Sequence, residues 1–279
     1  MIDYRIPVGA TLESVIDFLV VHCSGATRAF SAVTDAALSV LEHGLAFIPW
    51  WLFIPAVALL TWRGTGSRGL GLFALLGLGL VYNMGLWPAT VSTIALVLVA
   101  TLLAVLIGLP LGVFAAINKV AYRAIMPVLD VMQTMPAFVY LIPAIPFFGL
   151  GKVAAIFSTV VFAMPPVIRL TCLGIRQVPV ELVECAEAFG TNRWQRLRKL
   201  ELPLAAPTIM AGVNQTVMLA LSMVVIAAMI GAKGLGGEVW KAIQRLEMGR
   251  GFEAGIGIVI VAICLDRLLQ KIGSRSARR

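Results

Sequence analysis

Charge is scarce in this 279-residue sequence. Asp, Glu, Lys and Arg together make up 13% of it, against roughly a quarter in ordinary soluble domains. Because hydrophobic residues make up 60%, we expect most of the chain to lie in lipid rather than around an aqueous core. The net charge of +8 would suit nucleic acid, but the basic residues stand in short loops between apolar runs, as membrane topology produces. Nucleic acid is therefore not an expected partner.

Groups that carry out chemistry are also few. The four cysteines are isolated and lack the paired spacing of a zinc site, so we interpret them as packing residues. The two histidines, His22 and His43, fit neither a metal cluster nor a catalytic dyad. No phosphate loop occurs, because the run from Gly149 to Lys152 lacks both the upstream glycine and the following hydroxyl residue. We expect no catalytic residue and no metal ligand in this chain, and it cannot bind ATP through a phosphate loop.

Long apolar runs separated by short polar loops predict an all-α membrane protein, a polytopic helical bundle with about seven transmembrane helices. The runs are about 45–62, 69–86, 91–117, 124–148, 153–175, 204–231 and 253–270. Prolines interrupt the fourth run at four places and the fifth at Pro165-Pro166. Irregular backbone at membrane depth survives only where protein or a water-filled path covers it. These breaks therefore indicate the interior of the bundle.

Residues 1–43 differ from the runs that follow. Apolar residues at Leu12, Val15, Ile16 and Leu19 follow the spacing of one helix face, so the segment is amphipathic. Such a helix could lie flat on the membrane or pack on neighbouring helices, and a partly ordered tail is the third alternative.

The distribution of basic residues predicts the topology. Seven spans place the loops at 62–69, 118–123 and 176–203 on the same side as the C-terminus, and this side gathers more than half of the 22 Lys and Arg residues. The positive-inside rule assigns that side to the cytoplasm and the N-terminus to the outside. The basic residues on this side are Arg63, Arg68, Lys119, Arg123, Arg169, Arg176, Arg193, Arg196, Arg198, Lys199, Arg267, Lys271, Arg275, Arg278 and Arg279.

The segment 181–203 is the one long polar interruption in the C-terminal two-thirds of the chain. Pro179 suits the first turn of a helix and Gly190 its left-handed end, which predicts a short helix over 180–189. Asn192 can cap a second short helix that is rich in Arg and Lys. The pattern indicates a rigid docking element at the membrane surface, although an ordinary solvated loop would share its composition.

This segment resembles the EAA loop of ABC importer permeases. The family pattern is Glu-Ala-Ala, three residues, Gly, nine residues, Ile, any residue, Leu-Pro, and every spacing is kept here. Cys185 stands for Ala and Leu200 for Ile. The resemblance implies that a cytoplasmic ATPase subunit docks on this loop and passes its closure to the membrane helices. The coupling residues it implies are Glu184, Cys185, Ala186, Phe189, Gly190, Arg193, Leu202 and Pro203.

The resemblance extends over about residues 45–272. The stretches 130–149, 218–234 and 251–270 closely resemble permeases of glycine betaine and proline betaine importers, a branch that also includes choline and trimethylamine N-oxide permeases. It implies a type I ABC importer permease in the bacterial inner membrane. Its implied partners are a second copy of the chain, two ATPase subunits that bind ATP and Mg, and an external substrate-binding protein. The resemblance thus implies a transport subunit that holds no cofactor and is not an enzyme. The implied division is an external segment 1–43, two peripheral helices in 44–87, a permease core 88–272 with the coupling loop 177–203, and a basic tail 273–279.

Polar and Met side chains in the later spans are candidates for the translocation path. A quaternary ammonium substrate favours aromatic, polar and Met surfaces with few fixed cations. Asp130 and Asp266 are instead expected to pair with basic residues, Asp130 with Arg169 and Asp266 beside Arg267. Hydrogen bonding between helices is an equal alternative for each uncharged candidate. The candidates are Gln133, Thr134, Met135, Tyr140, Asn214, Gln215, Met218 and Ser222.

Two other classes compete with the importer permease. An ion-coupled secondary transporter would need acids or histidines at mid-membrane and usually carries an inverted repeat, and the sequence offers neither. A membrane anchor for a soluble complex does not need several proline-broken spans. The sequence does not distinguish between betaine-like substrates, because in the family the binding protein selects them.

Overall fold

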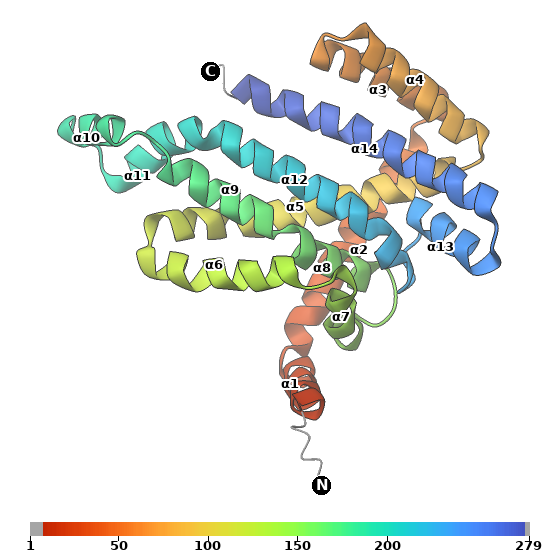
Figure 1. The fold of residues 1–279 in the computed structure, drawn as a ribbon, viewed down its shortest axis with the longest axis horizontal. Helices are drawn as coiled ribbons and strands as arrows, with labels where there is room; N and C mark the ends of the chain where they lie inside the picture. The colour runs from red at the N-terminus through yellow and green to blue at the C-terminus, as the bar shows by residue number, and fades with distance from the viewer. Residues whose placement is uncertain (1–7, 277–279) are drawn as a thin grey trace.

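The computed structural model describes residues 8–276, and this part of the chain is helical with no strand. Residues 1–7 of the predicted N-terminal segment and residues 277–279 of the predicted basic tail lie outside it, as do the side chains of 269–276. Figure 1 shows α5, α12 and α14 running roughly parallel and α2 crossing them, with α13 at one end of the bundle and α10 and α11 at the other. The C-terminal end of α14 lies near the α10 end.

The centre of the bundle is built from α5 (Trp87–Ile117), α8 (Lys152–Ala163), α9 (Pro165–Arg176) and α12 (Leu202–Ala228). Glycines let these helices approach closely, as is common in membrane bundles. A Cβ added at Gly112 of α5 would lie 2.7 Å from the Ile168 carbonyl oxygen on α9. The backbones of α5 and α9 are therefore in contact at this point.

We expect Gly112→Leu to destabilise the chain by about 1–3 kcal/mol, since a larger side chain must force α5 and α9 apart. Thermal unfolding of the purified complex in detergent measures this as a lower midpoint. Gly79→Leu is the matched control, because Gly79 also lies inside an apolar helix but, within the described part of the chain, has no neighbouring atom within 4 Å of the added Cβ. Equal midpoints for the two variants would contradict close α5–α9 packing.

A peripheral layer covers one side of this centre. It consists of the hairpin of α3 (Trp50–Thr65) and α4 (Arg68–Asn83), packed with α14 (Met248–Ser276) around Leu78, Val81 and Ile260. Both hairpin helices have 16 residues, slightly short of the length that crosses a bilayer alone.

The amphipathic N-terminal segment forms α1 (Val8–His22) and α2 (Ser24–Phe47), and α2 packs on neighbouring helices. Leu38 is buried in the main core, and Phe30 contacts the rings of Phe148 and Phe157. Lys152 Nζ at the start of α8 lies 2.6 Å from a Glu42 carboxylate oxygen. Packing on neighbours is therefore the alternative that the structure selects for α2. Because α2 runs to Phe47, the boundary predicted at residue 43 falls inside a helix.

Among the described residues the structure gives four to six apolar spans where the sequence predicts about seven, and the shorter apolar helix α4 would be the seventh. Four stretches are long and apolar enough to cross a membrane: 87–117, 152–176, 193–228 and 248–268. Two further pairs qualify only if each bent pair counts as one span. These are α2 with α3, bent by 100°, and α6 (Lys119–Thr134) with the segment 137–148, bent by 113°.

The second bend replaces the kinked fourth span predicted over 124–148. It occurs at Met135, whose extended backbone (φ −71°, ψ 135°) is what the following Pro136 favours. A 3₁₀ turn, Ala137–Tyr140, and α7 (Leu141–Phe148) then continue in a new direction. The Tyr140 hydroxyl donates to the Met132 carbonyl across the bend, and Ser158 Oγ on α8 donates to the Tyr140 carbonyl at 3.2 Å. Proline starts the bend, and these long-range contacts hold it.

Candidate coupling loop and translocation path

The segment predicted to couple to an ATPase projects from one end of the bundle as two short helices (Figure 1). α10 spans Val180–Ala188, and Gly190, two residues beyond its end, has a φ of +77°. A left-handed residue there is cheap only for glycine. The Thr191 hydroxyl donates to the Ala186 carbonyl at 2.7 Å and closes the end of α10. The predicted helix and its left-handed glycine end are confirmed.

The second helix, α11 (Arg193–Arg196), begins with the predicted Asn192 cap. Asn192 Oδ1 accepts from the Gln195 backbone N–H at 2.8 Å, and the Gln195 side chain accepts from the Asn192 N–H at 3.0 Å. This reciprocal capping box fixes the turn between the helices. A π-helical turn, Leu197–Glu201, leads directly into α12, so the loop is continuous with a central helix of the bundle.

A charge cluster that the sequence analysis missed ties α10 to the start of α12. Arg196 forms ion pairs with Glu187 on α10 and with Glu201, whose Oε1 lies 2.9 Å from Arg196 Nε. Glu201 is only 6% exposed. A buried carboxylate needs a partner of opposite charge. The only indication of such a partner in the sequence was the large number of Arg and Lys residues in the segment. A single guanidinium therefore connects α10 to the turn that leads into α12.

The outer surface of the loop carries two exposed aromatic rings. Phe189 is 85% exposed and Trp194 is 75% exposed. Four further residues of the segment are also exposed: Glu184, Cys185, Arg193 and Pro203. Three are half-buried: Ala186, Arg196 and Leu202. Large exposed aromatic side chains on a rigid turn are typical of a protein-binding surface. Trp194 was not among the predicted coupling residues.

The predicted path residues fall into two groups. Gln133, Thr134, Gln215, Met218 and Ser222 are exposed on the single chain. On α12, Gln215, Met218 and Ser222 follow helical spacing and form one stripe with Ala211. Met135 is half-buried at the bend.

Tyr140 and Asn214 form the second group, whose polar atoms already contact protein. Tyr140 is buried at the bend described above. Asn214 Nδ2 donates to an Asp266 carboxylate oxygen on α14 at 2.7 Å. For these two residues the structure shows the hydrogen bonding between helices that was the alternative to a path role. The predicted ion pair between Asp130 and Arg169 is confirmed, and Asp266 lies 3.7 Å from Arg267.

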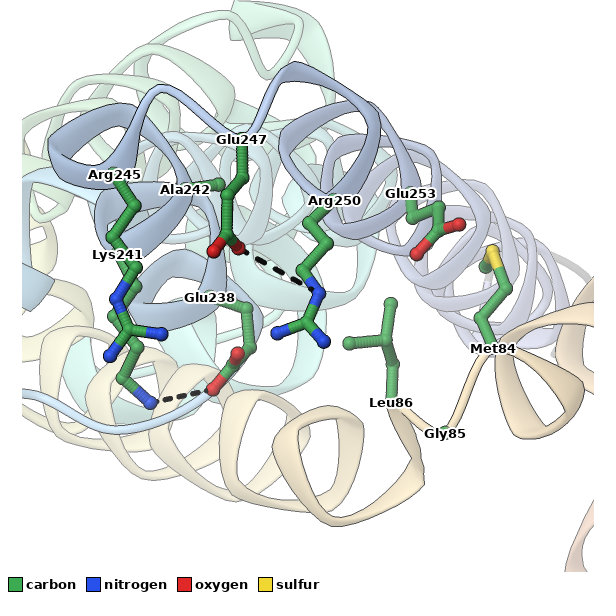
Figure 2. A pocket seen from close by; sticks show the side chains of 10 residues that line it. All are labelled: Met84, Gly85, Leu86, Glu238, Lys241, Ala242, Arg245, Glu247, Arg250 and Glu253. Atoms are coloured by element: carbon green, nitrogen blue, oxygen red, sulfur yellow. Dashed lines mark hydrogen bonds and ion pairs between the residues drawn. The ribbon is translucent and has the colours of Figure 1, made fainter.

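A charged hollow of 320 Å³ lies at the opposite end of the bundle (Figure 2). It is formed by α13 (Leu235–Arg245), the start of α14 and the α4–α5 turn. Lys241 pairs with Glu238 at 2.8 Å and Arg250 with Glu247 at 3.7 Å. The hollow therefore presents both signs of charge at its rim. Figure 2 also shows Arg245 and Glu253 on opposite sides of it. Next to it, Leu246 has a φ of +57° and is 83% exposed.

More than half of the chain matches a known protein family. Residues 108–278 match the family described as "Binding-protein-dependent transport system inner membrane component". The chain belongs to this family. It is a permease subunit of an ABC importer and not an enzyme, since the ATPase of such systems is a separate subunit. The family resemblance inferred from the sequence is thus confirmed, as is placement in the inner membrane.

Two permeases of glycine betaine transport systems are similar to this chain over nearly its whole length. The chain is 46% identical over 275 residues to the glycine betaine transport system permease protein OpuAB of Bacillus subtilis, covering 99% of this chain and 97% of that protein. It is 46% identical over 274 residues to the glycine betaine/proline betaine permease ProW of Escherichia coli, covering 98% of this chain and 77% of that protein.

Solved structures agree with the fold. Two inward-facing structures of the MetNI methionine ABC transporter align with TM-scores of 0.56 and 0.59, at 26% and 25% identity. They cover 67% and 69% of this chain and 91% and 94% of those chains. The predicted type I importer permease fold is confirmed.

Proposed function

We propose that this permease forms the translocation path for a compatible solute of the betaine type, such as glycine betaine, proline betaine or choline. The observation that carries the proposal is the 46% identity, over nearly the whole chain, to a glycine betaine permease. The α12 stripe of Gln215, Met218 and Ser222 supports it, since it offers polar and sulfur surfaces without a fixed cation to repel a quaternary ammonium. A second copy of the chain would close the path opposite this stripe.

The test is reconstitution of the chain with its ATPase subunit and external binding protein in proteoliposomes. We expect uptake of labelled glycine betaine that requires ATP and the binding protein, and competition by other quaternary ammonium zwitterions but not by methionine. Uptake driven by an ion gradient without ATP would contradict the proposal.

In this assembly the ATPase subunit docks on the loop 181–203 and binds ATP and Mg, so that this chain holds no cofactor. Two such loops, one from each permease copy, would match two ATPase subunits related by a two-fold axis. Phe189 and Trp194 would anchor each contact, because exposed aromatic rings dominate the binding energy of many interfaces.

The loop end of the bundle is proposed to face the cytoplasm, with the N-terminus outside. Two exposed native cysteines allow a direct test, because Cys23 lies between α1 and α2 and Cys185 lies on α10, while Cys172 and Cys264 are buried. A membrane-impermeant maleimide should label Cys23 in intact spheroplasts and Cys185 only in inverted vesicles. Cys23→Ser and Cys185→Ser identify the labelled residue. Reversed labelling would contradict this orientation.

The external substrate-binding protein is proposed to dock at the α13 end. Support comes from the charged hollow and from the adjoining exposed side chains of Leu246, Met248 and Phe252, an apolar patch with a charged rim. We expect Arg245→Glu to weaken the binding protein's stimulation of ATP hydrolysis about tenfold in apparent affinity, because a charge at an interface rim is reversed. Arg28→Glu, on α2, is the control, and equal effects of both variants would place docking elsewhere.

A further inference from the structure

An apolar crevice of 500 Å³ separates the peripheral layer from the centre of the bundle. Side chains from α5 and α12 form one wall, and α14, α3 and α4 form the other, with Leu45 of α2 at the margin. The crevice is lined by Phe53, Leu98, Val105, Val217, Val261 and Leu265, among others. None of its lining residues belongs to the coupling loop or to the path candidates.

This crevice lies at the depth of the hydrocarbon core. Its lining residues on α5 fall between Ile94 and Val105, in the middle of a 31-residue helix that is long enough to cross the bilayer. Leu102 lines it and is 57% exposed, and Leu106 one turn on from it is 60% exposed. The crevice is therefore continuous with a surface that contacts lipid.

Water does not fill such a space. A buried water needs two to four polar partners, and the lining offers one side-chain hydroxyl, that of Thr101. Thr101 Oγ1 is buried and has no hydrogen-bond partner among the residues that the structure describes, whereas Thr90 and Thr93 on the same helix donate to carbonyls one turn back. The volume is more than three times the roughly 150 Å³ of an apolar cavity that admits benzene.

The geometry of α12 separates the crevice from the exposed stripe, where a second copy of the chain is proposed to bind. Val213 and Val217 line the crevice, whereas Gln215 and Ser222 belong to the exposed stripe. At 3.6 residues per turn, positions two apart lie on nearly opposite sides of a helix. A copy that covers the stripe, as proposed above, would therefore approach α12 from the side away from Val213, and the crevice would stay open to the bilayer.

We propose that the crevice binds one acyl chain of a membrane phospholipid, as a site with its own occupancy rather than as part of the general lipid shell. A flexible, unbranched hydrocarbon matches a dry space of irregular shape that opens to lipid. The bound chain joins α3, α4 and α14 to α5 and α12. The Asn214–Asp266 hydrogen bond, next in sequence to Val213 and Leu265, links the same two walls. The proposal rests on a membrane-spanning chain and on the proposed position of the second copy at the α12 stripe, and does not depend on the transported solute.

The test uses a phospholipid with a diazirine in the middle of one acyl chain, incorporated with the intact importer into nanodiscs. After irradiation, mass spectrometry maps the labelled residues. We expect labelling of crevice residues on α5, α12 and α14 to exceed that of Leu106 at least fivefold. It should also saturate near one lipid per copy as the probe fraction rises. Labelling that is uniform over all lipid-facing helices, or absent from the crevice, would overturn the proposal.

Two filling variants and one matched control sharpen the result. Val105→Trp and Val217→Phe should each reduce crevice labelling at least fivefold. Leu106→Trp, adjacent to Val105 but outside the lining, should leave it unchanged. If neither filling variant inserts, the saturation curve of the unmodified chain decides. A disulfide between copies through Leu98→Cys would identify the second copy as the occupant and also overturn the proposal.

Discussion

Gly190→Val is expected to leave the chain inserted in the membrane and to reduce ATP-driven uptake at least tenfold. Gly190 holds a φ of +77°, and no atom of the described residues lies within 4 Å of an added Cβ, so the cost is conformational and not steric. A left-handed conformation costs a residue other than glycine roughly 1–2 kcal/mol, and β-branched valine is especially disfavoured there. The turn would relax, moving α10 away from α11. Uptake and co-purification of the ATPase are the measurements.

Gly66→Val is the matched control for this change. Gly66 ends α3 with a φ of +70°, also has open space around it, and lies in the α3–α4 turn. It carries the same backbone cost without belonging to the proposed docking element. Glu184→Lys tests the loop independently, by reversing an exposed charge on α10. Normal uptake and normal ATPase binding in both Gly190→Val and Glu184→Lys would show that the loop is an ordinary connection.

Arg196→Leu is expected to have the second large effect. It removes the only ion-pair partner found for Glu201 among the described side chains, those of residues 9–268, and leaves that carboxylate buried. Breaking a buried pair from one side costs about 3–5 kcal/mol. Because Arg196 also holds Glu187, α10 should lose its fixed position relative to α12. The purified chain should unfold at a lower temperature and release the ATPase.

The double variant Arg196→Leu with Glu201→Leu separates the two consequences. Replacing both partners by apolar residues removes the stranded charge, so the unfolding temperature should recover. The link between α10 and α12 stays broken, so uptake should remain low. Recovery of uptake together with stability would show that the cluster only stabilises the loop and does not transmit motion.

The sequence alone determined the fold class, because backbone groups in lipid must be satisfied within helices and a long apolar run therefore has one structural outcome. It also determined the local geometry of the coupling loop. The left-handed end at Gly190 and the cap at Asn192 depend on neighbours a few residues away, and such local signals can be recognised in one sequence.

The tertiary structure decided what depends on distant residues. Pro136 marks a break in the sequence, but the 113° bend is held by Tyr140 and Ser158 from separate elements. Packing of α2 on the bundle includes an ion pair between residues 110 positions apart, Glu42 and Lys152. The sequence made Asn214 a candidate for the path, but in the structure its side chain donates to Asp266 on α14. The hydropathy of a residue indicates whether its side chain tolerates lipid. It does not indicate which helix that side chain will contact.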